Sequence, residues 1–133
     1  MRRLYVVALV GALAGCGGSP TSPSPPPNVA GAWDWFQVVP RQGGGFNENP
    51  TGLVATFQQT GGSLTATVAV NNAPQVLASG TGAVTADRVF TLQLVSPGAT
   101  CNFTGTVDTT TTITGTQTCP SNGFTVGFTF RKR

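Results

Sequence analysis

Three cysteines and four carboxylates are the side chains of this 133-residue chain that could carry chemistry, and no histidine accompanies them. Without histidine, the nucleophile pairs of the Ser-His and Cys-His kind are excluded. The chain's one lysine, Lys132, lies in a basic tail and is a poor candidate for a catalytic base. We therefore expect neither an enzyme nor a cofactor.

The four carboxylates do not point to a paired catalytic site. Asp87 and Asp108 fall in predicted turns, where a short acidic side chain bonds nearby backbone. Glu48 lies in a glycine-rich loop, and Asp34 stands between two tryptophans. Two carboxylates could in principle run glycoside hydrolysis, but only Asp34 has aromatic neighbours. We expect no catalytic residue and no metal site.

The first fifteen residues have the plan of a secretory signal peptide. Arg2 and Arg3 precede an apolar run of about eleven residues, 4–14, and small residues stand before Cys16. A basic start, an apolar stretch of about 7–15 residues and a small-residue cleavage site define such peptides. A transmembrane helix would need about 18 or more apolar residues. We expect residues 1–15 to be removed.

The stretch Leu13-Ala14-Gly15-Cys16 resembles the bacterial lipobox at all four positions. The resemblance implies cleavage before Cys16, a diacylglycerol on its thiol, and a further acyl chain such as palmitate on the new amino terminus. Two lipid chains anchor a protein stably to a membrane without spanning it. Gly17, rather than aspartate, follows the cysteine, and by resemblance to Gram-negative lipoproteins this implies the periplasmic or surface face of the outer membrane.

The mature chain is long enough for one small domain. Removing residues 1–15 leaves 118 residues with five basic and four acidic side chains, a charge of +1 that does not indicate a nucleic-acid partner. After Cys16, residues 17–28 hold five prolines in twelve positions, which favours an extended tether. We expect residues 16–28 to form this tether and residues 29–133 to fold as a monomeric domain.

From residue 29 onward, apolar and polar residues alternate with a period of two, which is typical of strands. We expect a glycine-rich loop over residues 41–50 and about eight short strands, near residues 32–39, 53–58, 64–70, 76–84, 89–95, 101–107, 113–119 and 124–130. Short strands joined mainly by tight turns predict an all-β antiparallel meander, closed or nearly closed into a barrel, with a β-sandwich as the alternative. Closure is favoured because it leaves no free edge strand.

Cys101 and Cys119 form an even pair once Cys16 is lipidated, and an oxidising compartment favours a disulfide between them. A two-cysteine metal site is the alternative, but no carboxylate stands beside either cysteine in the sequence. Facing cysteines on antiparallel strands lie within disulfide distance.

This register has consequences for the neighbouring residues. It would place Gly105 opposite Gly115 and Val107 opposite Ile113, with the turn on residues 109–111.

Gly31-Ala32-Trp33 opens the first expected strand, and Arg131 ends the last. This arrangement is similar to the calycin group of lipocalins, avidins and barrel-shaped protease inhibitors. In that group a Gly-x-Trp motif packs beneath a basic residue from the closing strand. The resemblance implies a structural role for Gly31, Trp33 and Arg131.

The aromatic residues near the start of the domain are the candidates for binding. Trp33 and Trp35 share one face of the first strand and Phe36 lies on the other, beside the loop that holds Phe46. Trp35, Phe36 and Phe46 are therefore candidate binding residues, although tryptophans are more often part of a core.

The residues expected on the inner wall are compatible with either a hollow barrel or a filled one. Its positions combine small residues with aromatic ones, namely Ala55, Ala66, Gly105 and Gly115 together with the phenylalanines at 57, 90, 103, 124 and 128. A hollow barrel would bind a small apolar ligand, and the end loops of either barrel would bind an envelope protein. The alternatives are a structural or interaction lipoprotein with a filled barrel and no ligand, or a barrel-type protease inhibitor.

Overall fold

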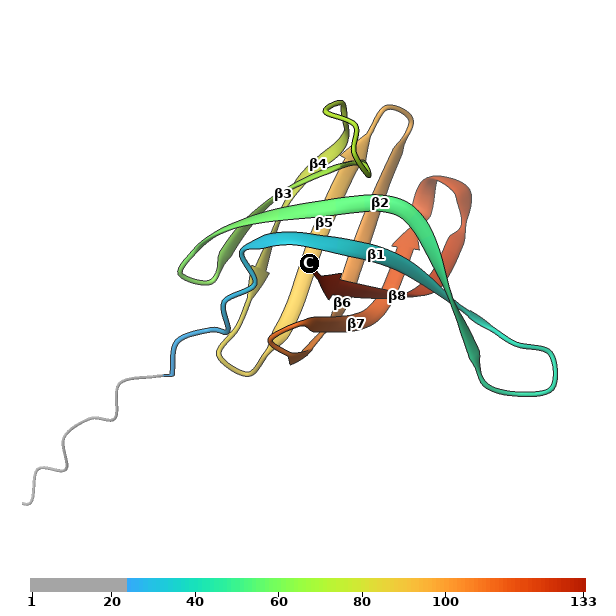
Figure 1. Cartoon of the computed structure of the whole chain (residues 1–133), viewed down its shortest axis with the longest axis horizontal. Coiled ribbons are helices and arrows are strands. Elements are labelled where there is room, and N and C mark those ends of the chain that lie inside the picture. The colour runs from blue at the N-terminus through green and yellow to red at the C-terminus, as the bar shows by residue number, and fades with distance from the viewer. Residues whose placement is uncertain (1–23) are drawn as a thin grey trace, which may run out of the picture.

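The computed structural model describes residues 24–133, and this part of the chain forms a closed antiparallel β-barrel. Each strand pairs with the next along the chain, and β8 pairs back onto β1 (Figure 1). The strands are β1 (Gly31–Pro40), β2 (Phe46–Thr60), β3 (Ser63–Val70), β4 (Val76–Val84), β5 (Val89–Ser96), β6 (Ala99–Thr109), β7 (Thr112–Cys119) and β8 (Phe124–Lys132). A short 3-10 helix, η1 (Pro120–Asn122), joins β7 to β8.

The barrel expectation is confirmed, and the sandwich alternative is wrong. Closure rests on the pairing of β1 with β8, which runs without interruption from Trp33 opposite Lys132 to Val38 opposite Gly127. Because β8 also pairs with β7 along most of its length, no strand of this meander is left with an unpaired edge inside the sheet.

Aromatic side chains fill the interior, and small residues of the inner wall make room for them. Each of four inner aromatics stands opposite a small residue on a neighbouring strand: Trp33 opposite Ala55, Phe57 opposite Ala66, Phe90 opposite Gly105, and Phe128 opposite Gly115. Ring-to-ring contacts link these side chains across the barrel. The Phe57 and Phe130 ring centroids are 5.5 Å apart, and those of Phe103 and Phe128 are 5.1 Å apart. The small residues therefore line a filled barrel.

The segment before β1 covers one end of the barrel. Val29 is fully buried, and its carbonyl oxygen accepts a 2.8 Å hydrogen bond from Trp33 Nε1. The Gln59 side chain accepts from the Val29 amide and donates to the carbonyl of Pro27. Pro27, placed in the tether by sequence, thus contacts the barrel. Within residues 24–133, no helix is long and apolar enough to cross a membrane.

The expected loop over residues 41–50 is wrong, because half of it belongs to β2. Residues 46–50 pair with residues 36–40, so the β1–β2 hairpin projects beyond the rest of the barrel (Figure 1). The turn is shorter and is closed by hydrogen bonds between Arg41 and Gly45 and between Gly44 and Arg41. Gly43, Gly44 and Gly45 all have positive φ, which glycine adopts without strain.

Two residues of β8 differ in solvent exposure from what the alternation predicts. Phe124 was expected inside, but it begins β8 at the barrel end, separated from η1 by Gly123, and is 40% exposed. Thr129 was expected outside and does lie on the outer face, but Glu48 covers it and it is buried.

Candidate functional site

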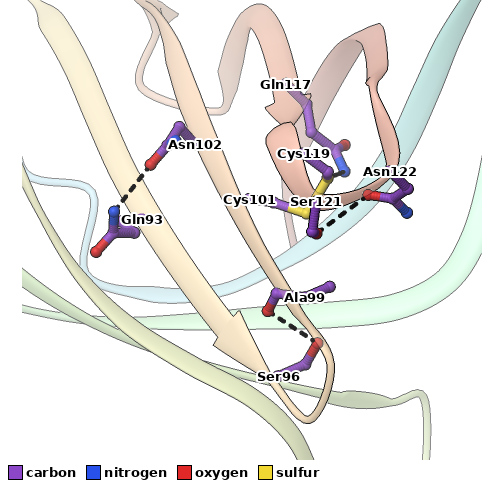
Figure 2. The surroundings of a disulfide bond; sticks show 9 residues. All are labelled: Gln93, Ser96, Ala99, Cys101, Asn102, Gln117, Cys119, Ser121 and Asn122. Atoms are coloured by element: carbon purple, nitrogen blue, oxygen red, sulfur yellow. Dashed lines mark hydrogen bonds between the residues drawn. A yellow bond between two sulfur atoms is a disulfide. The ribbon is translucent and has the colours of Figure 1, made fainter.

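The disulfide joins β6 to β7 at one end of the barrel. Cys101 and Cys119 are bonded, with their Cα atoms 4.1 Å apart (Figure 2). The metal alternative is therefore wrong, because neither thiol is free to bind an ion. Among residues 24–133, no cluster of three or more possible metal ligands occurs.

The register predicted from the cysteines is confirmed. Gly105 stands opposite Gly115, and Val107 stands opposite Ile113. The turn at residues 110–111 is one residue shorter than expected, because a bulge between Val107 and Thr109 takes up the difference.

The basic residue over Trp33 is Lys132, and the expectation of Arg131 is wrong. Trp33 stands opposite Lys132 in the β1–β8 pairing, and the Lys132 Nζ atom lies 5.6 Å from the centroid of the Trp33 ring. Gly31 has a φ of +117°, which L side chains rarely adopt, and a Cβ there would make only an ordinary 3.5 Å contact with Lys132 Cε. Arg131 pairs instead with Asp34 and faces outward, because successive residues of a strand face opposite sides.

Trp35 lies inside the barrel and does not form an external stacking platform. Its ring packs edge-on against Phe103, with centroids 5.3 Å apart, and lies 6.0 Å from that of Phe130. The Trp35 side chain belongs to the core, which was the alternative to a binding role considered for the tryptophans.

Phe36 lies under an arginine on the outer face. The Arg131 guanidinium is 5.8 Å from the centroid of the Phe36 ring. Arg131 Nη2 donates to Glu48 Oε2 at 2.7 Å, and Thr129 Oγ1 donates to Glu48 Oε1 at 3.0 Å. Glu48 of β2 thus reaches across β1 to two residues of β8. We call Phe36, Glu48, Thr129 and Arg131 the outer clasp.

The clasp sets the ionisation of its carboxylate. The hydrogen bond from Arg131 lowers the pKa of Glu48 below its usual value, against a smaller opposing effect of burial, and the Thr129 hydroxyl lowers it further. Glu48 is therefore an anion at neutral pH, and its two polar partners hold it against β8.

Next to the clasp lies an apolar groove of about 860 Å³. Its walls are the projecting part of the β1–β2 hairpin, residues 114–116 of β7 and residues 124–129 of β8, and we call it the hairpin groove. Val38, Pro40, Phe46 and Phe124 supply apolar surface, and threonines such as Thr116 and Thr125 supply hydroxyls. Phe46 is 69% exposed and Phe124 is 40% exposed, so two aromatic side chains are accessible there.

Asp34 and Asp108 each bond a polar side chain from another part of the barrel. Asp34 Oδ1 accepts a 2.8 Å hydrogen bond from Arg133 Nε, and the two side chains form an ion pair. Asp87 lies in the turn between β4 and β5, as expected. Asp108 was expected in a turn but lies in β6, where it accepts a 2.5 Å hydrogen bond from the Thr114 hydroxyl of β7. Cys16 and the signal sequence lie outside the described residues.

Of the three candidate binding residues, only Phe46 lines the hairpin groove. Sequence reasoning missed Phe124 and the β7–β8 wall, because they lie 68 or more residues from Phe46 along the chain. A possible signal was the exposed aromatic that follows the turn-forming Pro-Ser-Asn-Gly stretch, 120–123.

Comparisons with known proteins bear on the fold. No family model matches the chain, and no curated protein matches it. A solved structure of a redesigned β-barrel aligns with 78% of this chain and 90% of its own, with a TM-score of 0.55 and 14% identity. At this level of identity, the likeness shows a shared barrel fold and nothing about function.

Proposed function

We propose that this protein is a lipid-anchored, non-enzymatic binding module of the bacterial cell envelope that holds a protein partner in the hairpin groove. The observation that carries the proposal is the pair of exposed aromatics, Phe46 and Phe124, on opposite walls of one apolar groove. Aromatic anchors in grooves commonly provide most of the energy of a protein interface.

The filled interior favours a protein partner over a small ligand in the barrel mouth. Seven aromatic side chains, Trp33, Trp35, Phe57, Phe90, Phe103, Phe128 and Phe130, pack on one another inside the barrel. An apolar ligand that fills the barrel mouth would have to displace these rings and their packing. The groove needs no such rearrangement, since its surface already faces outward.

The chemistry of the groove suits an extended apolar segment of the partner. Its aromatic and aliphatic walls would bury alternate apolar side chains, and the threonine hydroxyls would bond the polar groups between them. Apart from Glu48, which Arg131 neutralises, its lining residues are uncharged. A strongly charged partner segment would therefore gain little there.

The anchor places this groove away from the membrane. The tether enters at the Gly31 end of β1, whereas the groove lies at the Pro40 end of this ten-residue strand. At about 3.3 Å per residue, the two are roughly 30 Å apart. An anchor on Cys16 would thus present the groove to the compartment that the protein faces.

The groove is tested by capturing partners from detergent-solubilised envelopes with the mature protein and quantifying them by mass spectrometry. A true partner should fall at least tenfold with Phe46→Ser and with Phe124→Ser, since losing an aromatic hot spot costs about 2 kcal/mol or more. Val95→Ser, which removes an exposed side chain of β5 outside the groove, is the matched control. Capture of the same proteins in equal amounts by all variants would refute the proposal that the groove binds the partner.

The anchor is tested separately with Cys16→Ala. The unchanged protein should partition with the membrane fraction and carry a lipidated N-terminal peptide that begins at Cys16. The variant should lose both properties. Membrane association that persists without Cys16 would rule out this anchor while leaving the groove result intact.

A further inference from the structure

Two polar atoms are buried inside the barrel without a hydrogen-bond partner among residues 24–133: Trp35 Nε1 and Gln117 Oε1. Trp35 is 9% exposed and Gln117 is 3% exposed. The indole N–H can only donate a hydrogen bond, and the amide oxygen can only accept one. The two atoms are therefore complementary in hydrogen-bonding sense.

Both side chains are neighbours of Phe103. The Trp35 ring packs edge-on against the Phe103 ring, and Gln117 is the residue opposite Phe103 in the β6–β7 pairing. Gln117 belongs to the inner face of β7, two residues before Cys119. The unpartnered donor and acceptor thus belong to two side chains that both adjoin Phe103.

The orientation of the Gln117 amide leaves its oxygen available. Gln117 Nε2 donates to Cys119 Sγ at 3.5 Å, and Figure 2 shows the amide beside the disulfide. With the nitrogen committed to the sulfur, the oxygen is the atom that needs a donor. Sulfur is a weak acceptor, and the contact is made by the amide nitrogen. It therefore leaves the buried amide oxygen without a hydrogen bond.

One hydroxyl group would satisfy both atoms at once. A buried polar group without a partner costs about 1–3 kcal/mol, whereas a hydroxyl both accepts and donates. We propose that the disulfide end of the barrel holds a molecule whose hydroxyl oxygen accepts from Trp35 Nε1 and whose O–H donates to Gln117 Oε1. The hydroxyl belongs either to a buried water or to the alcohol end of a small ligand. This site lies inside the barrel and does not depend on the hairpin groove.

Trp33 provides an internal control. Its Nε1 donates to the Val29 carbonyl at 2.8 Å, so its hydrogen bond is already made by protein. Since the chain has two tryptophans, two indole N–H signals are expected in an NMR spectrum. Trp33→Phe and Trp35→Phe variants assign them.

The experiment is a water-contact NMR measurement on the ¹⁵N-labelled mature chain, with native mass spectrometry of the same sample. The Trp35 indole proton should show a cross-peak to a long-lived water, or to a ligand that appears as a stoichiometric mass adduct. The Trp33 proton should show neither. Water with no adduct identifies the first source, and an adduct identifies the second.

A variant ties the contact to the amide. Gln117→Leu should abolish the Trp35 cross-peak, whereas Gln93→Leu, at an exposed glutamine bonded to Asn102, should leave it unchanged. If Gln117→Leu does not fold, the wild-type measurement decides alone. A Trp35 indole proton that contacts only protein protons in the wild type would overturn the proposal.

Discussion

The two basic residues that end β8 have opposite roles because they face opposite sides of the sheet. Lys132 turns toward Trp33 and covers the core at the tether end. Arg131 turns outward, lies over Phe36 and bonds Glu48. Exchanging the order of these two residues would disturb both contacts, although the net charge would stay the same.

Glu48→Gln should make the protein less stable at neutral pH, by less than about 1 kcal/mol because the ion pair is exposed to solvent. Arg131 lowers the pKa of Glu48 in the folded state, so the contribution is present above the unfolded value of about 4.3. It is lost as the pH falls through the lower folded pKa.

Urea unfolding at pH 7 and at pH 3 checks this expectation. The difference between the wild type and Glu48→Gln should be smaller at pH 3 than at pH 7, while Asp87→Asn serves as a control for a turn carboxylate. A difference that is the same at both pH values would show that the clasp does not depend on the charge of Glu48.

Gly115→Ala should destabilise the barrel by about 2 kcal/mol or more, through overpacking. A Cβ at this position would lie 2.1 Å from the Thr104 carbonyl oxygen and 2.5 Å from Gly105 Cα, both in the backbone of β6. The neighbouring strand would have to move. Chemical denaturation measures the loss, and Thr104→Ala on the exposed face of β6 should cost far less. Equal stability of Gly115→Ala and the wild type would contradict the tight approach of β6 and β7.

At the scale of elements, the β6–β7 hairpin is the part of the barrel that a covalent bond fixes. Its outward positions carry many threonines, so hydrophobic patterning on that face does little to set the register. The disulfide supplies the missing constraint, with 18 residues of sequence separation.

Replacing both Cys101 and Cys119 with alanine should therefore lower the free energy of unfolding by about 3 kcal/mol, the chain-entropy value for a loop of this size. The wild type treated with a reductant should show a similar loss in urea. Unchanged stability on reduction would mean that the strands alone hold the register.

The β1–β2 hairpin shows why the groove was hard to predict from sequence. Asn47, Glu48, Asn49 and Pro50 have low strand propensity, and they follow three glycines. They form a strand because β1 offers paired backbone partners as far as Pro40. Such tertiary pairing overrides local preference and is not visible in a single segment.

At the scale of the whole molecule, the sequence predicted the strand number, the closure and the disulfide register. The period-two alternation predicts the strand number, and the position of Cys101 relative to Cys119 predicts the register of the disulfide-bonded strands. The hairpin groove could not be derived in this way, because it depends on how far one hairpin projects past strands more than 60 residues away. The sequence also did not decide whether the interior is hollow or filled. Small residues in the wall are compatible with a cavity until the positions of the neighbouring aromatic side chains are known.

The resulting molecule combines a rigid aromatic core with one accessible apolar surface at the end of β1 remote from the tether. Under the proposed anchoring, the core keeps the groove walls in place and the lipid holds the domain at the membrane. The central claim is that the hairpin groove contacts a specific envelope protein.

Photo-crosslinking in intact cells tests this claim most directly. A photoreactive phenylalanine analogue at position 46 should give a discrete crosslinked product that retains the lipid anchor, and the same analogue at position 124 should capture the same protein. At position 95, on β5, it should give no such product. No crosslink at 46 and 124, or an identical pattern at all three positions, would contradict the account.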